Sequence, residues 1–200
     1  MNIISEIDFH EMKRRWAIGE VKSHFFYCND PPVQEETLVW LKSGDPIKEE
    51  KGIRRHLITR GRNYINTIPQ DTKWFLAYLP ITESEFRKLR TILSKKNKGW
   101  NLYSGGSYLF LDAVNYLIKN SDADPRVKSI INEFQDQYIE LTGITFISRN
   151  NKGPYIIAEG TARLVAIYYH CILNKVKIFE NNAIEVAVGV SKTKWCWSPV

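Results

Sequence analysis

Apolar positions along the second half of the chain follow two alternating patterns. Apolar runs of strand length and β-type composition cover residues 74–79, 144–147, 155–158 and 184–190. Apolar residues at three- and four-residue spacing, typical of a helix with one buried face, cover residues 109–118, 126–142 and 161–174. Because strands alternate with helices, we predict an α/β (α+β) fold in which helices flank a mixed sheet.

Local start and stop signals refine the elements around the first apolar run. Pro80 ends that run, and Thr82 and Glu85 have the spacing of a capping box, so a helix is predicted over residues 83–93. Gly143 supplies a stop for the long helix that precedes it.

The N-terminal part of the chain shows weaker periodicity. A helix is predicted over residues 7–21 and another short element over 33–41. The charged stretch that follows is predicted to be a loop with a short strand at 56–59. We therefore expect residues 1–72 to form an N-terminal extension packed on a core domain of residues 73–200.

Composition indicates a folded protein that does not enter a membrane. Of its 200 residues, 44% are hydrophobic and 25% charged, which suffices for a core and argues against disorder. No apolar run approaches the roughly 20 residues that span a bilayer, and no export signal is evident, so a cytoplasmic location is predicted. Three widely spaced cysteines without a CxxC pair encode neither a disulfide framework nor a cysteine zinc site.

Positive charge gathers in two stretches. The net charge of +6 favours anionic partners such as nucleotides, nucleic acid or an acidic protein. The first cluster holds Arg87, Lys88, Arg90, Lys95, Lys96 and Lys98, and the second holds Lys48, Lys51, Arg54, Arg55, Arg60 and Arg62. Either cluster could be an ordinary solvated surface, or could bind phosphates while nearby aromatic residues stack on bases. No base-reading motif is present, so such binding is predicted to be independent of sequence.

The sharpest chemical feature is the turn that follows strand 155–158. Gly160 permits unusual backbone angles, and the first amides of a helix beginning at Thr161 form a site for anions. The predicted buried stripe of that helix consists of Ala162, Val165, Ala166, Tyr169, Ile172 and Leu173. Arg163 lies off this stripe, so we expect it to face outward and to donate hydrogen bonds from its planar guanidinium to phosphate oxygens. The alternative is a local ion pair between Glu159 and Arg163.

The stretch Ile156-Ile157-Ala158-Glu159-Gly160-Thr161-Ala162-Arg163-Leu164-Val165-Ala166 resembles the strand-Gly-x-x-Arg-x-x-Ala-helix signature of the ParB/sulfiredoxin-like superfamily. The resemblance extends over about residues 73–191. It implies that Gly160, Thr161 and Arg163 hold the phosphates of a nucleotide such as ATP, ADP or CTP, with Mg²⁺. Thr161 stands where sulfiredoxins carry their catalytic cysteine and where the related serine kinases carry a histidine, so the sulfiredoxin reaction is not expected.

Phosphoryl transfer or phosphodiester hydrolysis needs charge stabilisation, a metal ion and a base. Glu159 is the candidate base and Mg²⁺ ligand. A second carboxylate is expected from Glu83 or Glu85, for which helix capping is the alternative. The resulting prediction is a nucleotide-dependent phosphotransferase, nucleotide hydrolase or nuclease.

Two predictions without catalysis stay open beside the enzymatic one. The first is a sequence-independent nucleic-acid-binding protein that uses the basic residues Arg87, Lys88, Arg90, Lys95 and Lys96. The second is a degenerate ParB-like assembly module, and a dimer is compatible with every alternative. His170 is predicted to be a surface or packing residue, and the aromatic tail at 195–197 to close a core edge or an oligomer contact.

Overall fold

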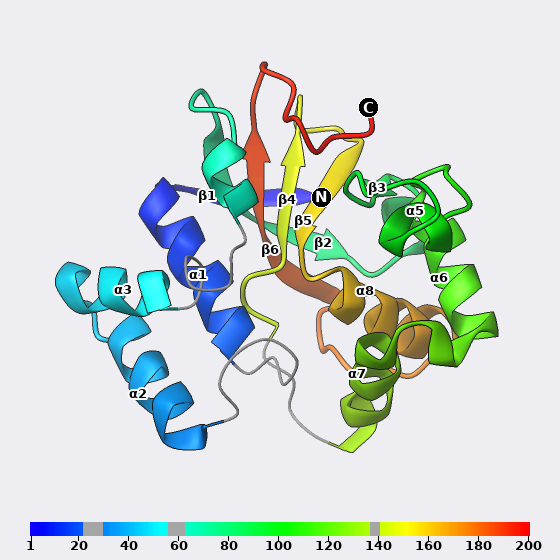
Figure 1. The fold of residues 1–200 in the computed structure, drawn as a ribbon, viewed down its shortest axis with the longest axis horizontal. Coiled ribbons are helices and arrows are strands. Elements are labelled where there is room, and N and C mark those ends of the chain that lie inside the picture. The colour runs from blue at the N-terminus through cyan, green and yellow to red at the C-terminus, as the bar shows by residue number, and fades with distance from the viewer. Residues whose placement is uncertain (22–29, 56–62, 137–140) are drawn as a thin grey trace.

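A mixed six-stranded sheet forms the centre of the protein (Figure 1). The computed structural model describes residues 1–21, 30–55, 63–136 and 141–200. The strands are β1 (Asn2–Ile7), β2 (Lys73–Pro80), β3 (Leu89–Arg90), β4 (Thr145–Ser148), β5 (Tyr155–Glu159) and β6 (Ala183–Val190), in the order β1-β2-β6-β4-β5-β3. The pairs β4–β6 and β3–β5 are parallel, and the remaining neighbours are antiparallel. The predicted α/β fold with a mixed sheet is confirmed.

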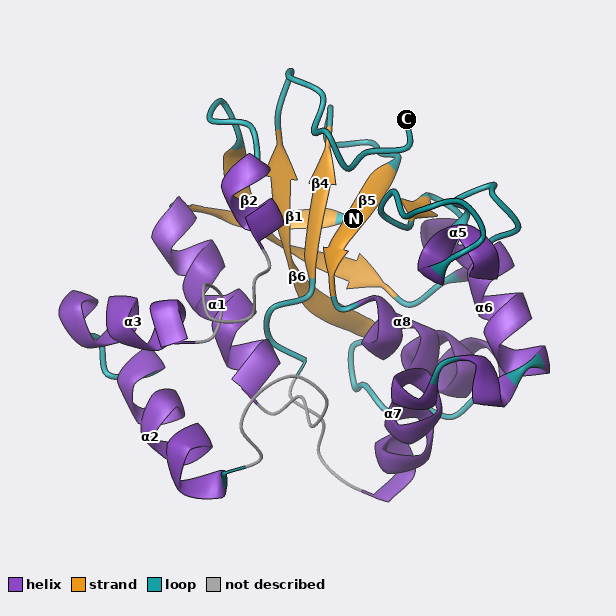
Figure 2. Cartoon of the chain, viewed as in Figure 1, coloured by secondary structure: helices purple, strands orange, loops and turns teal. Residues whose placement is uncertain are grey.

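Helices lie on both sides of this sheet (Figure 2). One group consists of α1 (Phe9–Val21), α2 (Pro31–Leu41) and α3 (Pro46–Ile53). The other consists of α4 (Glu83–Phe86), α5 (Gly99–Tyr103), α6 (Phe110–Lys119), α7 (Pro125–Asp136) and α8 (Thr161–Ile167), which continues into the π-helix η4 (Tyr168–Leu173). Short 3-10 turns cover η2 (Asn63–Thr67) and η3 (Ser121–Ala123). Within the described ranges, no helix has the length and hydropathy needed to cross a bilayer.

The sheet separates two hydrophobic cores. Along β5, Tyr155 and Ile157 belong to the core shared with α6, α7 and α8, whereas Ile156 and Ala158 belong to the core shared with α1. Side chains of successive strand residues point to opposite faces, so a strand covered on both faces is apolar at nearly every position. This explains the continuous apolar runs of the sequence.

Residues 1–72 contribute an edge strand and a helical layer. β1 pairs antiparallel with β2, and α1 places Met12, Trp16 and Val21 in the second core. Trp195 packs in that same core, is 2% exposed, and donates its Nε1–H to Thr67 Oγ1 at 3.0 Å. The aromatic tail thus closes an edge of the core, one of the two roles predicted for it.

The helix predicted over residues 83–93 is wrong beyond its first turn. The cap itself is present, because the Glu85 amide donates to Thr82 Oγ1 at 3.4 Å. The helix ends at Phe86, however, and Leu89 and Arg90 pair with Tyr155 and Ile156 as β3. Pairing with the open side of β5 buries Leu89 completely, which a continued helix would not achieve.

The charged stretch after residue 43 is also not a loop, since it contains α3. Asp45 caps this helix by accepting a hydrogen bond from the Ile47 amide at 3.0 Å, and Pro46 occupies the first helical turn. The strand predicted at 56–59 lies outside the described residues. β1 was not predicted because its residues are mostly exposed and lack a buried alternation.

Candidate functional site

The turn between β5 and α8 has a geometry that requires glycine. Gly160 has φ 90° and ψ 15°, in the left-handed region, and its carbonyl accepts the Leu164 amide at 2.9 Å to begin α8. A Cβ at this position would lie 2.8 Å from Ile144 Cγ1 and 3.3 Å from Ile144 Cα. Backbone conformation and packing against Ile144 are therefore enough to explain this glycine.

Arg163 is buried, with 7% of its surface exposed, so the expectation that it faces outward is wrong. Its Nη1 donates to the Thr142 carbonyl at 2.8 Å, and its Nη2 lies 3.6 Å from Glu159 Oε1. It also lies against Gly19 of α1, where a Cβ would be only 2.8 Å from Nη1. The guanidinium thus links three parts of the fold.

The face of α8 was mispredicted because the helix is covered on most sides. Leu164, Ile167 and Tyr168 are buried, although they lie off the predicted stripe, and Ala162 is half-buried. Thr161 at the first position is 9% exposed. Phosphate-binding residues expected at an open turn are therefore largely enclosed.

Glu159 is the predicted metal ligand and base. Its side chain is half-buried and forms the ion pair with Arg163. A cation at the same carboxylate would lie close to the guanidinium charge, which opposes metal binding there. Groups of three or more His, Cys, Asp or Glu side chains that could hold a metal ion are absent from the described part of the chain. The residues around Glu159 do not fit a Mg²⁺ site.

Glu83 and Glu85 lie at the other end of β5 from Glu159. The Tyr155 amide donates to the Lys88 carbonyl at 3.0 Å, which places the segment after α4 beside the first residue of β5. At about 3.3 Å per residue, Glu159 is roughly 13 Å farther along the strand. The structure therefore does not bring the three predicted catalytic carboxylates together.

Both carboxylates near α4 serve as partners of neighbouring cations. Glu83 pairs with Arg87, and Glu85 Oε1 accepts from Lys88 Nζ at 2.6 Å. Burial disfavours the charged form of Glu85, but the hydrogen bond from Lys88 and nearby positive charge outweigh it, so its pKa lies below the usual range. A low pKa suits an ion pair better than a general acid or base working near neutral pH.

His170 has a packing role, one of the two roles predicted for it. It is 1% exposed, its ring stacks on Phe134 with centroids 5.6 Å apart, and its Nε2 lies 2.9 Å from the Ile131 carbonyl oxygen. These contacts fix α8 and η4 against α7.

Three cations of the second basic cluster pair with acids of α2, of α3 or of its cap. Lys51 Nζ lies instead over the Trp40 ring, 3.8 Å from its centroid. Arg54 bonds to Glu50 at 2.9 Å, and Arg55 bonds to Glu36 at 2.7 Å. Lys48 lies 3.9 Å from Asp45. Arg60 and Arg62 lie outside the described residues. The described charges of this cluster are largely compensated within the fold.

The first basic cluster divides into two parts. Arg87 and Lys88 pair with acids of α4, and Arg90 Nη1 donates to the carbonyls of residues 87 and 89 at 2.8 Å each. Burial lowers the pKa of Arg90. Lys95, Lys96 and Lys98 are instead exposed, and have no ion-pair partner among the residues that the structure describes.

The fold brings two further basic segments to the same end of the sheet. Arg149 and Lys152 lie in the turn after β4, and Lys192 and Lys194 follow β6. Since β4 and β6 are parallel neighbours, their last residues meet at one edge (Figure 1). Arg149 Nη2 lies 3.5 Å from the Lys192 carbonyl oxygen, which joins the two segments directly.

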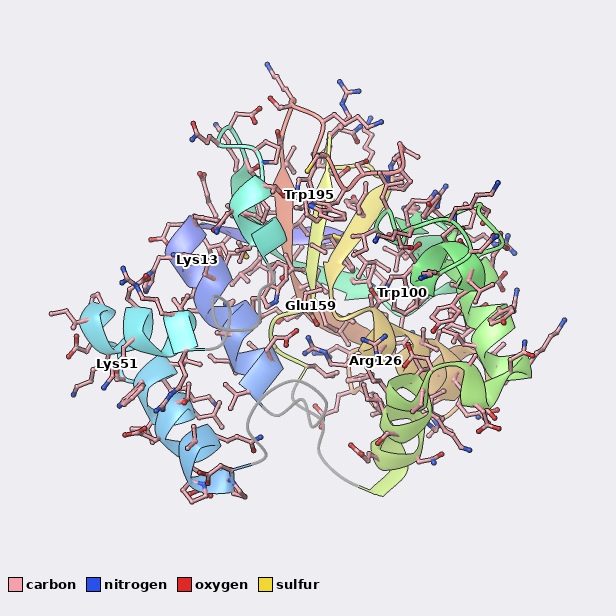
Figure 3. All side chains as sticks on the ribbon, in the orientation of Figure 1. Lys13, Lys51, Trp100, Arg126, Glu159 and Trp195 are labelled. Atoms are coloured by element: carbon pink, nitrogen blue, oxygen red, sulfur yellow. The ribbon has the colours of Figure 1, made fainter. Side chains whose placement is uncertain are left out.

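The segment of Lys95 reaches this edge through the C-terminal part of the chain. The Leu93 amide donates to the Trp197 carbonyl at 2.9 Å. We name the resulting surface the basic edge, which consists of Lys95, Lys96, Lys98, Arg149, Lys152, Lys192 and Lys194. All seven are exposed, and none has an ion-pair partner within the described ranges. Glu159 lies at the opposite end of the sheet from Trp195 and this edge (Figure 3).

Acidic side chains are scarce around the basic edge. Residues 88–111, 145–158 and 186–200 contain neither Asp nor Glu. Asp71 lies beside the chain after β6, where it accepts hydrogen bonds from Ser191 Oγ at 2.6 Å, the Lys192 amide at 3.1 Å and the Thr193 amide at 3.3 Å. The bond from Ser191, with those from the following amides, holds the pKa of Asp71 below its usual range. Asp71 thus fixes the conformation from which Lys192 and Lys194 project.

Charge runs in the sequence indicate Lys95 and Lys96 as nucleic-acid-binding candidates but do not reveal Arg149, Lys152, Lys192 and Lys194. Arg149 with Lys152, and Lys192 with Lys194, are groups of only two cations and do not stand out as charge runs in the sequence. The usable signal was the absence of acids over two long stretches, 145–158 and 186–200, each of which contains all or most of a predicted strand.

Comparisons with known proteins add no relatives. No family model matches the chain, and neither a curated protein nor a solved structure is significantly similar to it.

Proposed function

We propose that this protein binds nucleic acid through the basic edge, without preference for base sequence. The observation that carries the proposal is the convergence of three basic, acid-free segments on one end of the sheet. Their seven cations are exposed and have no described ion-pair partner. Cations of this kind can neutralise phosphates without first breaking an internal ion pair.

The chemistry of lysine supports backbone binding over base reading. Six of the seven residues of the basic edge are lysines, whose ammonium groups act as hydrated point charges on flexible stems. Contacts to phosphate release counterions and supply most of the affinity of sequence-independent complexes. All seven residues lie in turns and loops outside the helices and strands, so none is carried by a helix that could enter a groove, in agreement with backbone recognition.

A variant of the basic edge and a control variant of the second basic cluster test the proposal. Changing Lys95, Lys96, Lys192 and Lys194 together to Gln should weaken binding to a labelled oligonucleotide by on the order of 10- to 100-fold in fluorescence anisotropy. A control that changes Lys48 and Arg54 to Gln removes cations of the paired cluster and should bind within about threefold of wild type. Equal affinity of all three proteins, or no binding by wild type, would contradict the proposal.

Nucleotide binding at Gly160, Thr161 and Arg163, which the superfamily resemblance implies, has less support. Arg163 already bonds to Thr142 and pairs with Glu159 inside the fold. A thermal-shift experiment with ATP, ADP and CTP in the presence of Mg²⁺ tests this second site. A shift that is lost in the Arg163→Ala variant but kept in the four-lysine variant would favour the turn over the basic edge.

A further inference from the structure

We propose that the basic edge takes single-stranded nucleic acid in preference to a duplex, with Trp197 as the platform on which an unpaired base stacks. This inference rests on the proposed function and names its substrate class. It starts from the position of Trp197, whose carbonyl accepts the Leu93 amide and whose chain leads directly from Lys194. The indole therefore belongs to the segment that joins the cations of the edge.

The ring of Trp197 is held in place and still accessible. Its Nε1–H donates to Thr67 Oγ1 at 3.1 Å, the same oxygen that accepts from Trp195. The residue is 37% exposed. A ring whose orientation is fixed by a hydrogen bond loses little conformational freedom when a base stacks on it.

Other exposed aromatic residues of the described chain lack this setting. Tyr78 is 45% exposed but lies opposite Glu185 on the neighbouring strand. Phe9 is 42% exposed, stacks on Trp74 and has Lys13 Nζ 5.5 Å from its ring centroid. Of these three exposed rings, Trp197 alone belongs to a chain segment that also carries cations of the basic edge.

Aromatic stacking is the feature that separates single strands from duplexes. Lysines can reach the phosphates of either form, whereas base faces are open to an aromatic side chain only in an unpaired strand. A cationic groove with aromatic platforms is the usual composition of proteins that bind single strands without sequence preference. Trp197, in the same chain segment as Lys192 and Lys194, combines an aromatic platform with positive charge at the scale of one base.

The test compares three ligands of about 20 nucleotides, namely oligo-dT, oligo-U and a mixed-sequence DNA duplex. Wild type should bind a single strand about tenfold more tightly than the duplex. Trp197→Leu should lose about tenfold on single strands and less than about threefold on the duplex. Trp197→Phe keeps a ring without the Nε1–H and should retain most of the preference. Tyr78→Leu is the matched control and should behave as wild type.

Each outcome decides the inference. Equal or tighter binding of the duplex by wild type overturns it, as does an equal loss on both forms in Trp197→Leu; in either case salt-sensitive binding keeps the proposed function. Failure of all three ligands to bind removes the proposed function as well. If Trp197→Leu does not fold, the inference is still decided by the preference of wild type for single strands and by whether Trp197→Phe retains it. A preference shared by oligo-dT and oligo-U supports stacking on any unpaired strand, whereas a large difference between them assigns the site to DNA or to RNA.

Discussion

Replacing Gly160 with alanine tests whether the β5–α8 turn is built for the fold. The new Cβ would sit on a residue with φ 90° and would lie 2.8 Å from Ile144 Cγ1 and 3.3 Å from Ile144 Cα. Ile144 is completely buried, so its side chain has little room to move away. The substitution therefore adds backbone strain and a steric overlap at the same point.

The expected loss of stability follows from these two terms. A non-glycine residue in the left-handed region costs about 1–2 kcal/mol, and overpacking a core costs about 1–3 kcal/mol. The smaller entropy of the unfolded alanine chain returns about 0.4–1 kcal/mol. The free energy of unfolding should fall by about 1.5–4 kcal/mol, which is a large part of the typical 5–15 kcal/mol of a domain.

Gly105→Ala is the matched control for the backbone term. Gly105 has φ 59°, and a Cβ there would meet nothing within 4 Å. Its variant should lose at most about 1.5 kcal/mol. Urea denaturation followed by circular dichroism measures both, and the midpoint of Gly160→Ala should fall by roughly 1 M more than that of Gly105→Ala. Equal midpoints would refute the packing of Gly160 against Ile144.

Further predictions concern the buried Arg163 and the decrease of the free energy of unfolding at acid pH. Arg163→Ala leaves the Thr142 carbonyl and the Glu159 carboxylate without this partner, so unfolding should become easier by on the order of 2–4 kcal/mol, whereas affinity for an oligonucleotide should change less than about threefold. Unaltered stability in a denaturant titration would contradict the structural role of Arg163. Burial opposes ionisation of Glu11, but hydrogen bonds from Arg14 and Arg15 outweigh it and hold its pKa below the usual range. Its stabilisation is complete above the unfolded pKa of about 4.3 and is lost as the pH falls through the lower folded value. Glu11→Gln should therefore be less stable than wild type at neutral pH and closer to it in acid, and parallel stability curves between pH 3 and 7 would exclude this contribution.

Elements in which apolar residues recur with a clear period could be predicted from the sequence, because that period alone shows which of their residues are buried. The strands β2, β4, β5 and β6 and the helix α6 are of this kind, since each carries its buried face within its residues. β3 could not be predicted, because only the open side of β5 makes a strand of Leu89 and Arg90. α3 was missed despite its Asp45 cap and Pro46, since its residues are largely charged.

The candidate sites depend more than the helices and strands do on contacts between residues that are distant in sequence. The burial of Arg163 is decided by Thr142 and Gly19, which are distant in sequence, so helical spacing alone gave the wrong face. The basic edge requires the strand order, because Arg149 and Lys192 meet only when β4 and β6 are neighbours. Charge runs in the sequence likewise cannot show which cations are paired, as in α2 and α3, and which are available.

The salt dependence of oligonucleotide binding tests the central claim most directly. If the seven cations of the basic edge contact phosphates, the logarithm of the association constant should fall linearly with the logarithm of salt concentration between about 50 and 200 mM, with a slope of up to about −5 for a single strand. Changing Lys95, Lys96, Lys192 and Lys194 to Gln should reduce the magnitude of that slope by about 3, whereas the Lys48 and Arg54 control should leave it unchanged. A flat response in wild type, or a slope that the four substitutions do not alter, would contradict nucleic-acid binding at the basic edge.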